Sequence, residues 1–211
     1  MKTILCYGDS NTWGYVPGSG RRHPFEQRWT GVLQAQLGGE ARVIEEGLNG
    51  RSTVLEEPFR SGRSGAALLP VLLESHAPVD LLILMLGTND VLHYTEVTAE
   101  DAARGISMLV DLTRIAAVRG GFRAPDILLV SPPLATTLSA EMKLYCQGDP
   151  AKTNGFAEHY RRAADKLNCR FLDAAAVAAA SPEDGIHLDQ EAHRRLGLAA
   201  AKAVQEALRA Q

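Results

Sequence analysis

Three features that would point to particular protein classes are missing from this sequence of 211 residues. No apolar run approaches the roughly 18 residues that a membrane helix needs, so we expect no membrane partner. The formal net charge of -3 argues against a nucleic-acid partner, because phosphate binding needs a basic face, and no lysine or arginine run is long enough to change this. No two cysteines have the CxxC or zinc-finger spacing of a metal or redox site.

The cysteines that are present, Cys6, Cys146 and Cys169, are odd in number and far apart. They indicate free thiols, and Cys6 and Cys169 lie in apolar, strand-like runs where cysteine serves as a small core residue. The first ten residues, MKTILCYGDS, have a short apolar stretch that runs into a glycine turn, which is typical of a first strand and not of a signal peptide. We therefore expect a cytoplasmic location.

Short apolar runs alternate with longer stretches of helical period, the pattern of βα units around a parallel sheet. The run at 81–86 is apolar throughout, as in a central strand that helices cover on both faces. We predict one three-layer α/β domain over residues 1–211. The predicted strands are 3–7, 41–45, 81–86, 127–130 and 170–172, and the predicted helices are 29–37, 66–75, 99–118, 153–167 and 190–208, the last capped by Asp189.

A serine follows the first predicted strand directly, in the turn Gly8-Asp9-Ser10. Ligands of open α/β sheets bind at the carboxyl ends of strands, so a serine there can expose its hydroxyl at the start of a helix, close to backbone N–H groups. An isolated Gly-Asp-Ser is more often a turn with a helix cap. Position alone therefore only suggests that Ser10 is a nucleophile.

A serine nucleophile needs a base, and the base needs a third group that orients it. Asp184 and His187 can supply both, because a carboxylate three residues before an imidazole can fold back onto its Nδ1–H. His187 would then face Ser10 through Nε2, and Asp184 would stabilise the imidazolium as it forms.

Acyl transfer also needs hydrogen-bond donors aimed at the developing oxyanion. Gly87-Thr88-Asn89-Asp90 follows the most hydrophobic predicted strand and would bring the Asn89 amide to the sheet edge where Ser10 lies. Gly47-Leu48-Asn49-Gly50 follows the second strand and can present the backbone N–H of Gly50 beside that of Ser10. Each segment taken singly also fits an ordinary Gly/Asn turn.

Four strand ends thus supply, in chain order, a serine, a glycine N–H, an asparagine amide and an Asp-x-x-His pair, which are the parts needed for acyl transfer. At these residues the sequence resembles the GDSL or SGNH hydrolase superfamily, whose named residues are Ser, Gly, Asn and His in such blocks. The match spans nearly the whole chain and consists of Gly8-Asp9-Ser10, Gly50, Gly87-Thr88-Asn89-Asp90 and Asp184-Gly185-Ile186-His187.

Further residues resemble the bacterial arylesterase and acyltransferase branch of that superfamily, namely Thr12-Trp13-Gly14, Arg28-Trp29, 46–51 and Val130-Ser131-Pro132-Pro133. The resemblance implies a flavodoxin-like α/β/α sandwich with a central five-stranded parallel sheet. It also implies hydrolysis of short-chain or aryl esters through an acyl-enzyme on Ser10, with no cofactor. Asn11 departs from the family pattern, which has leucine there, and leaves the acyl preference open.

Three aromatic residues lie near the predicted nucleophile in the sequence, Trp13, Tyr15 and Trp29. Trp13 and Tyr15 fit an aromatic wall for an aryl or small acyl group as well as they fit core packing, whereas Trp29 fits the core better. Together with Asn11, Trp13 and Tyr15 are the predicted substrate-binding residues.

Two patterns that suggest other chemistry are rejected. Ser64 lies in a near match to G-x-S-x-G, but that elbow requires a preceding strand, and 56–60 is polar and contains a proline. His187, Asp189 and His193 suggest a metal site, but Asp189 serves better as the cap of the last helix and His193 is expected on its exposed side. We predict no metal.

Two alternatives stay open. A flavodoxin-like protein that binds flavin or phosphate would use a Ser/Thr/Asn-rich loop after the first strand, which Ser10-Asn11-Thr12 matches, although Asp184 and His187 then have no role. Within the enzyme class, an alcohol or peroxide could accept the acyl group in a site that excludes water. The irregular segments 16–27 and 131–151 are long enough for binding loops, and 131–151 is where we expect the contacts of a homo-oligomer.

Overall fold

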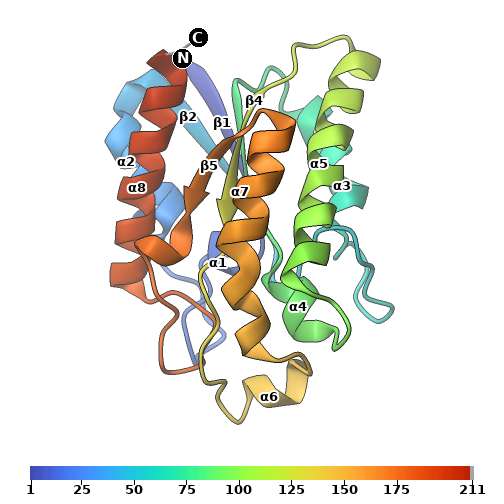
Figure 1. Cartoon of the computed structure of the whole chain (residues 1–211). Helices are drawn as coiled ribbons and strands as arrows, with labels where there is room; N and C mark the ends of the chain where they lie inside the picture. Colours follow the sequence, from blue (N-terminus) through green and yellow to red (C-terminus); the bar gives the residue numbers. More distant parts are fainter. Residues whose placement is uncertain (210–211) are drawn as a thin grey trace.

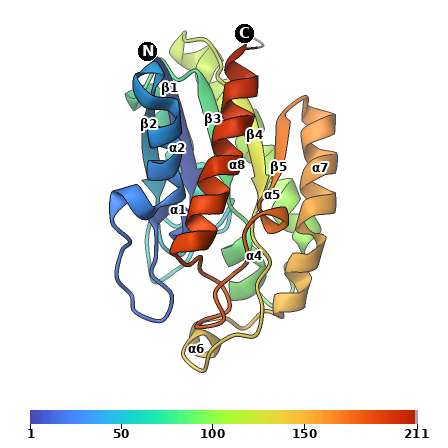
Figure 2. The same cartoon turned by 90° about the vertical axis from the view of Figure 1, so that its left-hand side faces the viewer.

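The apolar segments pair into one parallel sheet in the computed structural model, which describes residues 1–209. Its strands are β1 (Lys2–Gly8), β2 (Ala41–Gly47), β3 (Leu81–Met85), β4 (Asp126–Ser131) and β5 (Arg170–Asp173). They lie in the order β2-β1-β3-β4-β5 (Figures 1 and 2), which is the flavodoxin-like order. The predicted α/β fold with a central five-stranded parallel sheet is confirmed.

Alternate side chains of the strands face two helical layers. Leu5 and Tyr7 of β1 pack on the side of α3 (Gly65–Ser75), α5 (Ala99–Gly120) and α7 (Phe156–Leu167). Ile4 and Cys6 pack on the side of α2 (Trp29–Leu37) and α8 (Gln190–Arg209). Since β3 is buried on both faces, it is apolar at every position.

Short helices are the elements that the sequence did not predict: α1 (Ser10–Trp13), α4 (Thr88–His93) and α6 (Met142–Tyr145). One helical turn holds too few residues for an apolar period to be recognised. The predicted helix 153–167 is wrong at its start, since α7 begins at Phe156 and a 3-10 helix over Pro150–Gly155 precedes it. This 3-10 helix was likewise too short to be recognised. Two further 3-10 turns, Phe25–Gln27 and Gly38–Glu40, flank α2, and a third, Ala174–Ala176, follows β5.

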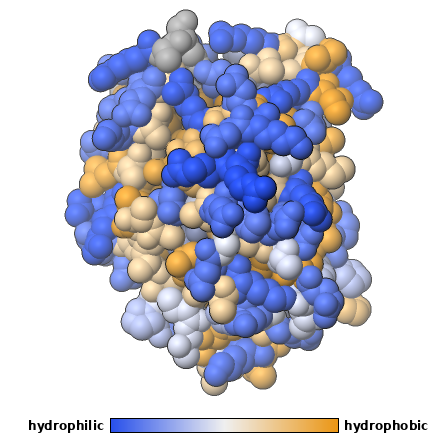
Figure 3. All heavy atoms as spheres, viewed as in Figure 1, coloured by the Kyte–Doolittle hydropathy of each residue, from blue (hydrophilic) through white to orange (hydrophobic). Residues whose placement is uncertain are grey.

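No helix within residues 1–209 is both long enough and apolar enough to cross a membrane. The face drawn in Figure 3 carries hydrophilic side chains over most of its area, with apolar ones in small groups, as is usual for a protein surface.

The first three strands end at one level, because Gly8 of β1 pairs with both Gly47 of β2 and Met85 of β3. From β1 the chain crosses to β2 on one side of the sheet, whereas β3, β4 and β5 are added on the other side of β1. The direction of winding therefore reverses between β1 and β3, and the crevice beyond their carboxyl ends is the topological switch point. A Cβ atom at Gly47 would lie 2.1 Å from the backbone nitrogen of Trp13, so only glycine lets α1 pack against the end of β2. This packing fixes the segment that begins with Ser10 at the switch point.

Candidate active site

Ser10 is the first residue of α1, directly beyond the end of β1. The Asp9 carboxylate caps this short helix by accepting a hydrogen bond from the Asn11 N–H at 2.9 Å. The Ser10 hydroxyl oxygen lies 2.9 Å from Nε2 of His187, which comes from a loop 177 residues further along the chain. The hydroxyl of Ser10, the predicted nucleophile, and the imidazole are therefore in direct hydrogen-bond contact.

Asp184 orients His187 from the other side. Its Oδ2 lies 2.7 Å from His187 Nδ1, and its Oδ1 accepts the backbone N–H groups of Ile186 and His187, each at 2.9 Å. The intervening Gly185 has a φ of 83°, which permits the turn that folds the carboxylate back. Burial alone would raise the pKa of Asp184, but the hydrogen bonds and charge of His187 and these N–H groups lower it to about 2. Asp184 is thus ionised at neutral pH and accepts the Nδ1 proton.

Asn89 and Gly50 face the same cavity as Ser10 and His187. Asn89 Nδ2 donates one hydrogen bond to the carbonyl of Arg51 at 2.9 Å, and since an amide carries two N–H groups, a second donor is left. Gly50 lies in the turn after β2 with a φ of 79°, a conformation that favours glycine. The structure thus brings together the serine, glycine, asparagine and histidine that lie far apart in the sequence.

Arg51 is a buried cation that ties these parts together, and sequence reasoning assigned it no role. Its guanidinium donates to the carbonyl of Gly8 at 2.9 Å and to that of Glu46, and lies 4.1 Å from the centre of the Tyr7 ring. Its own carbonyl holds the Asn89 amide. Arg51 therefore links the residue before the Asp9-Ser10 turn to the asparagine. Its signals in the sequence were its place after Gly50 and the resemblance of 46–51 to the arylesterase branch.

Two buried carboxyl groups lie behind the site. Burial is the main cause that raises the pKa of Asp9 to about 6, although the Asn11 N–H and the charges of His187 and Arg51 oppose it. Burial likewise raises the pKa of Asp90 to about 7, against hydrogen bonds from the N–H and hydroxyl of Thr53. Asp90 thereby holds the chain that follows Arg51.

Replacing Asp90 with asparagine is expected to make stability less dependent on pH. With its pKa of about 7, the folded protein keeps the Asp90 proton over a range in which the unfolded chain, with a pKa near about 4, has lost it. The stability from this proton is complete below about pH 4 and is lost as the pH rises to about 7. Between these pH values, the free energy of unfolding should fall less in Asp90→Asn than in wild type, by at least about 2 kcal/mol.

Urea denaturation at the two pH values measures this difference. Asp165→Asn, on the exposed surface of α7, is the matched control and should follow the wild type. An equal fall in Asp90→Asn and wild type would mean that Asp90 is already ionised in the folded protein.

Asn11 does not face the cavity, which corrects its prediction as a substrate-binding residue. Its side chain is buried and accepts the Leu188 N–H at 3.0 Å while its amide lies 3.4 Å from the Ile186 carbonyl. Both partners flank His187 in the sequence. A polar residue at this position therefore holds the histidine loop against α1, a contact that leucine could not make.

The three aromatic residues lie in different places, and only Tyr15 reaches the cavity. Tyr15 lines the cavity, with its ring stacked on that of His187. Trp13 is half-buried outside the cavity lining, with the Arg22 guanidinium 5.0 Å from its ring centre. Trp29 is 2% exposed and packs in the core, as predicted.

The rejected motifs have structural explanations. Ser64 is buried, and its hydroxyl donates to the carbonyl of Val54 at 3.0 Å. Asp189 caps α8 by accepting the Ala192 N–H at 2.8 Å, as predicted. The prediction that His193 is exposed is wrong: it is fully buried, and its Nδ1 accepts the Trp29 N–H at 3.2 Å, which links α8 to α2. Among residues 1–209, no three potential metal ligands lie together.

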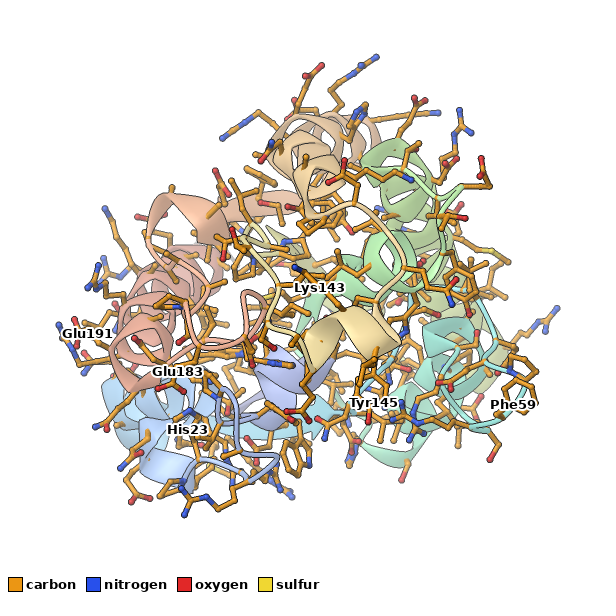
Figure 4. All side chains as sticks on the ribbon, turned by 90° about the horizontal axis from the view of Figure 1, so that it is seen from below. His23, Phe59, Lys143, Tyr145, Glu183 and Glu191 are labelled. Atoms are coloured by element: carbon orange, nitrogen blue, oxygen red, sulfur yellow. The ribbon has the colours of Figure 1, made fainter. Side chains whose placement is uncertain are left out.

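The cavity at the serine has a volume of about 260 Å³. Figure 4 views this edge of the sheet from below and shows α6, with Lys143 and Tyr145, over its middle, between His23 on one side and Phe59 on the other. Besides the residues already described, the cavity is lined by Asn49, Arg60, Leu92, His93, Glu141, Met142, Tyr145, Cys146 and Ile186.

The three cysteines are free thiols. Cys6 and Cys146 are buried and Cys169 is half-buried, so the core placement of Cys6 is confirmed.

An α/β/α sandwich with a serine, histidine and aspartate in hydrogen-bond contact beside an open cavity is an arrangement suited to acyl transfer. The chain belongs to the GDSL-like lipase/acylhydrolase family, whose model matches residues 6–195. The predicted resemblance to the GDSL or SGNH hydrolases is confirmed.

Solved structures agree with this membership. A carbohydrate acetylesterase from Sinorhizobium meliloti is 37% identical, with a TM-score of 0.92 over 98% of this chain and 100% of that one. The M. smegmatis aryl esterase is 41% identical, with a TM-score of 0.91 over 98% of this chain and 99% of that one. A lipolytic G-D-S-L protein from Veillonella parvula, 17% identical with a TM-score of 0.65 over 98% and 97% of the chains, shares the fold. No curated protein sequence matches the chain.

Proposed function

We propose that the protein is a serine esterase that hydrolyses short-chain or aryl carboxylic esters through an acyl-enzyme on Ser10. The observation that carries this proposal is the hydrogen-bonded series from Ser10 through His187 to Asp184, which opens into a cavity lined by Gly50 and Asn89. A flavin- or phosphate-binding module would have no use for the Asp184 and His187 pair.

In the proposed reaction, the Ser10 hydroxyl oxygen attacks the ester carbonyl carbon as its proton moves to Nε2 of His187. The carbonyl electron pair moves to oxygen, and the resulting anion accepts hydrogen bonds from the N–H groups of Ser10 and Gly50 and from the Asn89 amide. The tetrahedral intermediate then collapses and expels the alcohol, which takes the proton from His187 and leaves the acyl group on Ser10. In the second half of the reaction, His187 takes a proton from water as the water oxygen attacks the acyl carbon. The bond to Ser10 then breaks, His187 returns the proton to the serine oxygen, and the acid is released.

The size of the cavity supports a small acyl group. Its volume of about 260 Å³ lies below the roughly 300 to 1,000 Å³ of most ligand pockets. Leu92, Met142 and Ile186 supply apolar lining, whereas Asn49, Arg60 and Glu141 add polar groups. The similarity to a carbohydrate acetylesterase supports a small acyl group, and the similarity to an aryl esterase as well supports alcohol parts of different size.

Nitrophenyl esters of increasing acyl length should therefore lose reactivity. Overfilling a packed site costs about 1 to 3 kcal/mol, so we expect kcat/KM to fall about five- to 150-fold between the butyrate and the octanoate. Initial rates of nitrophenol release measure this. A kcat/KM that rises up to octanoate would contradict a small acyl site.

We also propose that an alcohol or peroxide can take the acyl group from Ser10 in place of water. It is supported by the apolar part of the cavity lining, where the hydrocarbon part of an alcohol can be buried. The same ester series with a competing alcohol separates the outcomes, because transfer yields a new ester in place of the acid.

We also propose that the protein self-associates through the segment 131–151. The exposed side chains of Leu144 and Tyr145 on α6 support this proposal.

A further inference from the structure

The ring of Tyr15 is stacked on the imidazole of His187. The ring centres are 4.1 Å apart and the planes are inclined by 26°. Both ring nitrogens of His187 are occupied at its edge, by Asp184 at 2.7 Å and by Ser10 at 2.9 Å. Tyr15 therefore covers a face of the ring, a position from which it can act on the histidine without taking either hydrogen bond.

The main chain holds Tyr15 in this place. Its N–H donates to the carbonyl of Ser10 at 3.0 Å, and its backbone forms an antiparallel bridge with Arg22. Burial, followed by the charges of Glu141 and Asp184, raises the pKa of the Tyr15 hydroxyl, so the ring is uncharged at neutral pH. A neutral aromatic ring presents the negative side of its quadrupole to whatever lies on its face.

We propose that Tyr15 is a positioning residue, whose ring fixes the plane of His187 and stabilises the imidazolium that forms when Ser10 gives up its proton. The inference rests on the proposed esterase function and adds a role for Tyr15 besides that of a cavity wall. A cation on an aromatic face is attracted to it, whereas the neutral imidazole is attracted less, so stacking favours the protonated form.

Other charged or titratable groups also act on His187 and must stay constant in any test. Asp184 contacts it and Asp9 lies close enough to interact by charge. Three further charged or titratable residues line the same cavity, namely Arg60, His93 and Glu141. His193 lies nearby from α8, and burial lowers its pKa to about 3, so it is neutral. Substitutions at Tyr15 leave all of these groups in place.

The effect of the aromatic face can be separated from that of simple cover. Tyr15→Leu keeps an apolar side chain over the imidazole but removes the quadrupole, whereas Tyr15→Phe keeps the ring and removes only the hydroxyl. Tyr15→Leu removes the attraction between the imidazolium and the aromatic ring. At a partly exposed site, this loss should shift the acidic limb of the kcat/KM profile toward lower pH by about 0.4 to 0.7 pH unit. The plateau rate should fall about two- to fivefold. The midpoint in Tyr15→Phe should stay at the wild-type value.

The experiment measures kcat/KM for nitrophenyl acetate and the rate of phosphonylation of Ser10, each against pH, in the wild type and both variants. A parallel titration of the histidines by NMR reports the same midpoint without turnover, and Tyr15→Met replaces Tyr15→Leu if the latter does not fold. A lower plateau with an unshifted midpoint in Tyr15→Leu would overturn the proposal and leave Tyr15 as a wall. Ser10→Ala is run beside them: if it stays active, the proposed function itself fails, whereas an inactive Ser10→Ala with unshifted Tyr15 variants rejects only this inference.

Discussion

Replacing Ser10 with alanine is expected to leave a folded protein whose esterase rate is lower by at least about 10³. The hydroxyl is the proposed covalent nucleophile, and its oxygen is the atom that lies 2.9 Å from His187 Nε2. Alanine fits the same space, and the Asp9 carboxylate still caps α1 through the Asn11 N–H. Stability should therefore change little while the acyl-enzyme can no longer form.

Steady-state rates with nitrophenyl acetate and thermal unfolding of the same preparation measure the two effects. A fluorophosphonate probe should label Ser10 in the wild type and nothing in Ser10→Ala. Ser64→Ala is the matched control, because Ser64 lies in the rival motif but its hydroxyl only donates to the carbonyl of Val54. That variant should lose about 1 kcal/mol of stability and still be labelled. Labelling that disappears with Ser64 and persists without Ser10 would overturn the assignment.

The sheet and the main helices could be predicted from the sequence because their signals are local. An apolar run such as Leu81–Met85 is buried on both faces, and α2 was predicted with the bounds Trp29–Leu37 that it has. The residues gathered at the switch point were also predictable, since the carboxyl ends of parallel strands share one edge and a chemical role needs several groups there at once.

The remaining features depend on contacts between distant segments. Nothing near His193 in the sequence shows that α2 packs over it, so its burial and its bond to the Trp29 N–H were missed. The inward side chain of Asn11 likewise depends on backbone groups about 175 residues away. Asp90 and Arg51 look like surface charges in a turn, and only the folded chain supplies Thr53 and the Gly8 carbonyl as their partners. Long-range polar partners are not encoded in a local pattern.

Replacing Asn89 with alanine is expected to lower kcat by about 10² to 10³, or roughly 2.7 to 4 kcal/mol, with little change in KM. One amide N–H of Asn89 is bonded to the Arg51 carbonyl, and the other is the proposed donor to the oxyanion. That donor matters most once the carbonyl oxygen carries a charge, so the loss affects the transition state more than substrate binding. Ser10 and His187 stay in contact, so the variant should still react with a fluorophosphonate, although more slowly.

The competing role for Asn89 is structural, since its bond to Arg51 helps to hold the segment after β2. If that were its whole role, Asn89→Ala would unfold at a lower temperature but keep nearly the wild-type kcat. Thermal unfolding and kcat measured on one preparation distinguish the two cases. Some loss of stability is expected in either, about 1 kcal/mol for one hydrogen bond, so the decision rests on kcat. A destabilised but fully active variant would remove Asn89 from the oxyanion site and leave Ser10 and Gly50 as its only proposed donors.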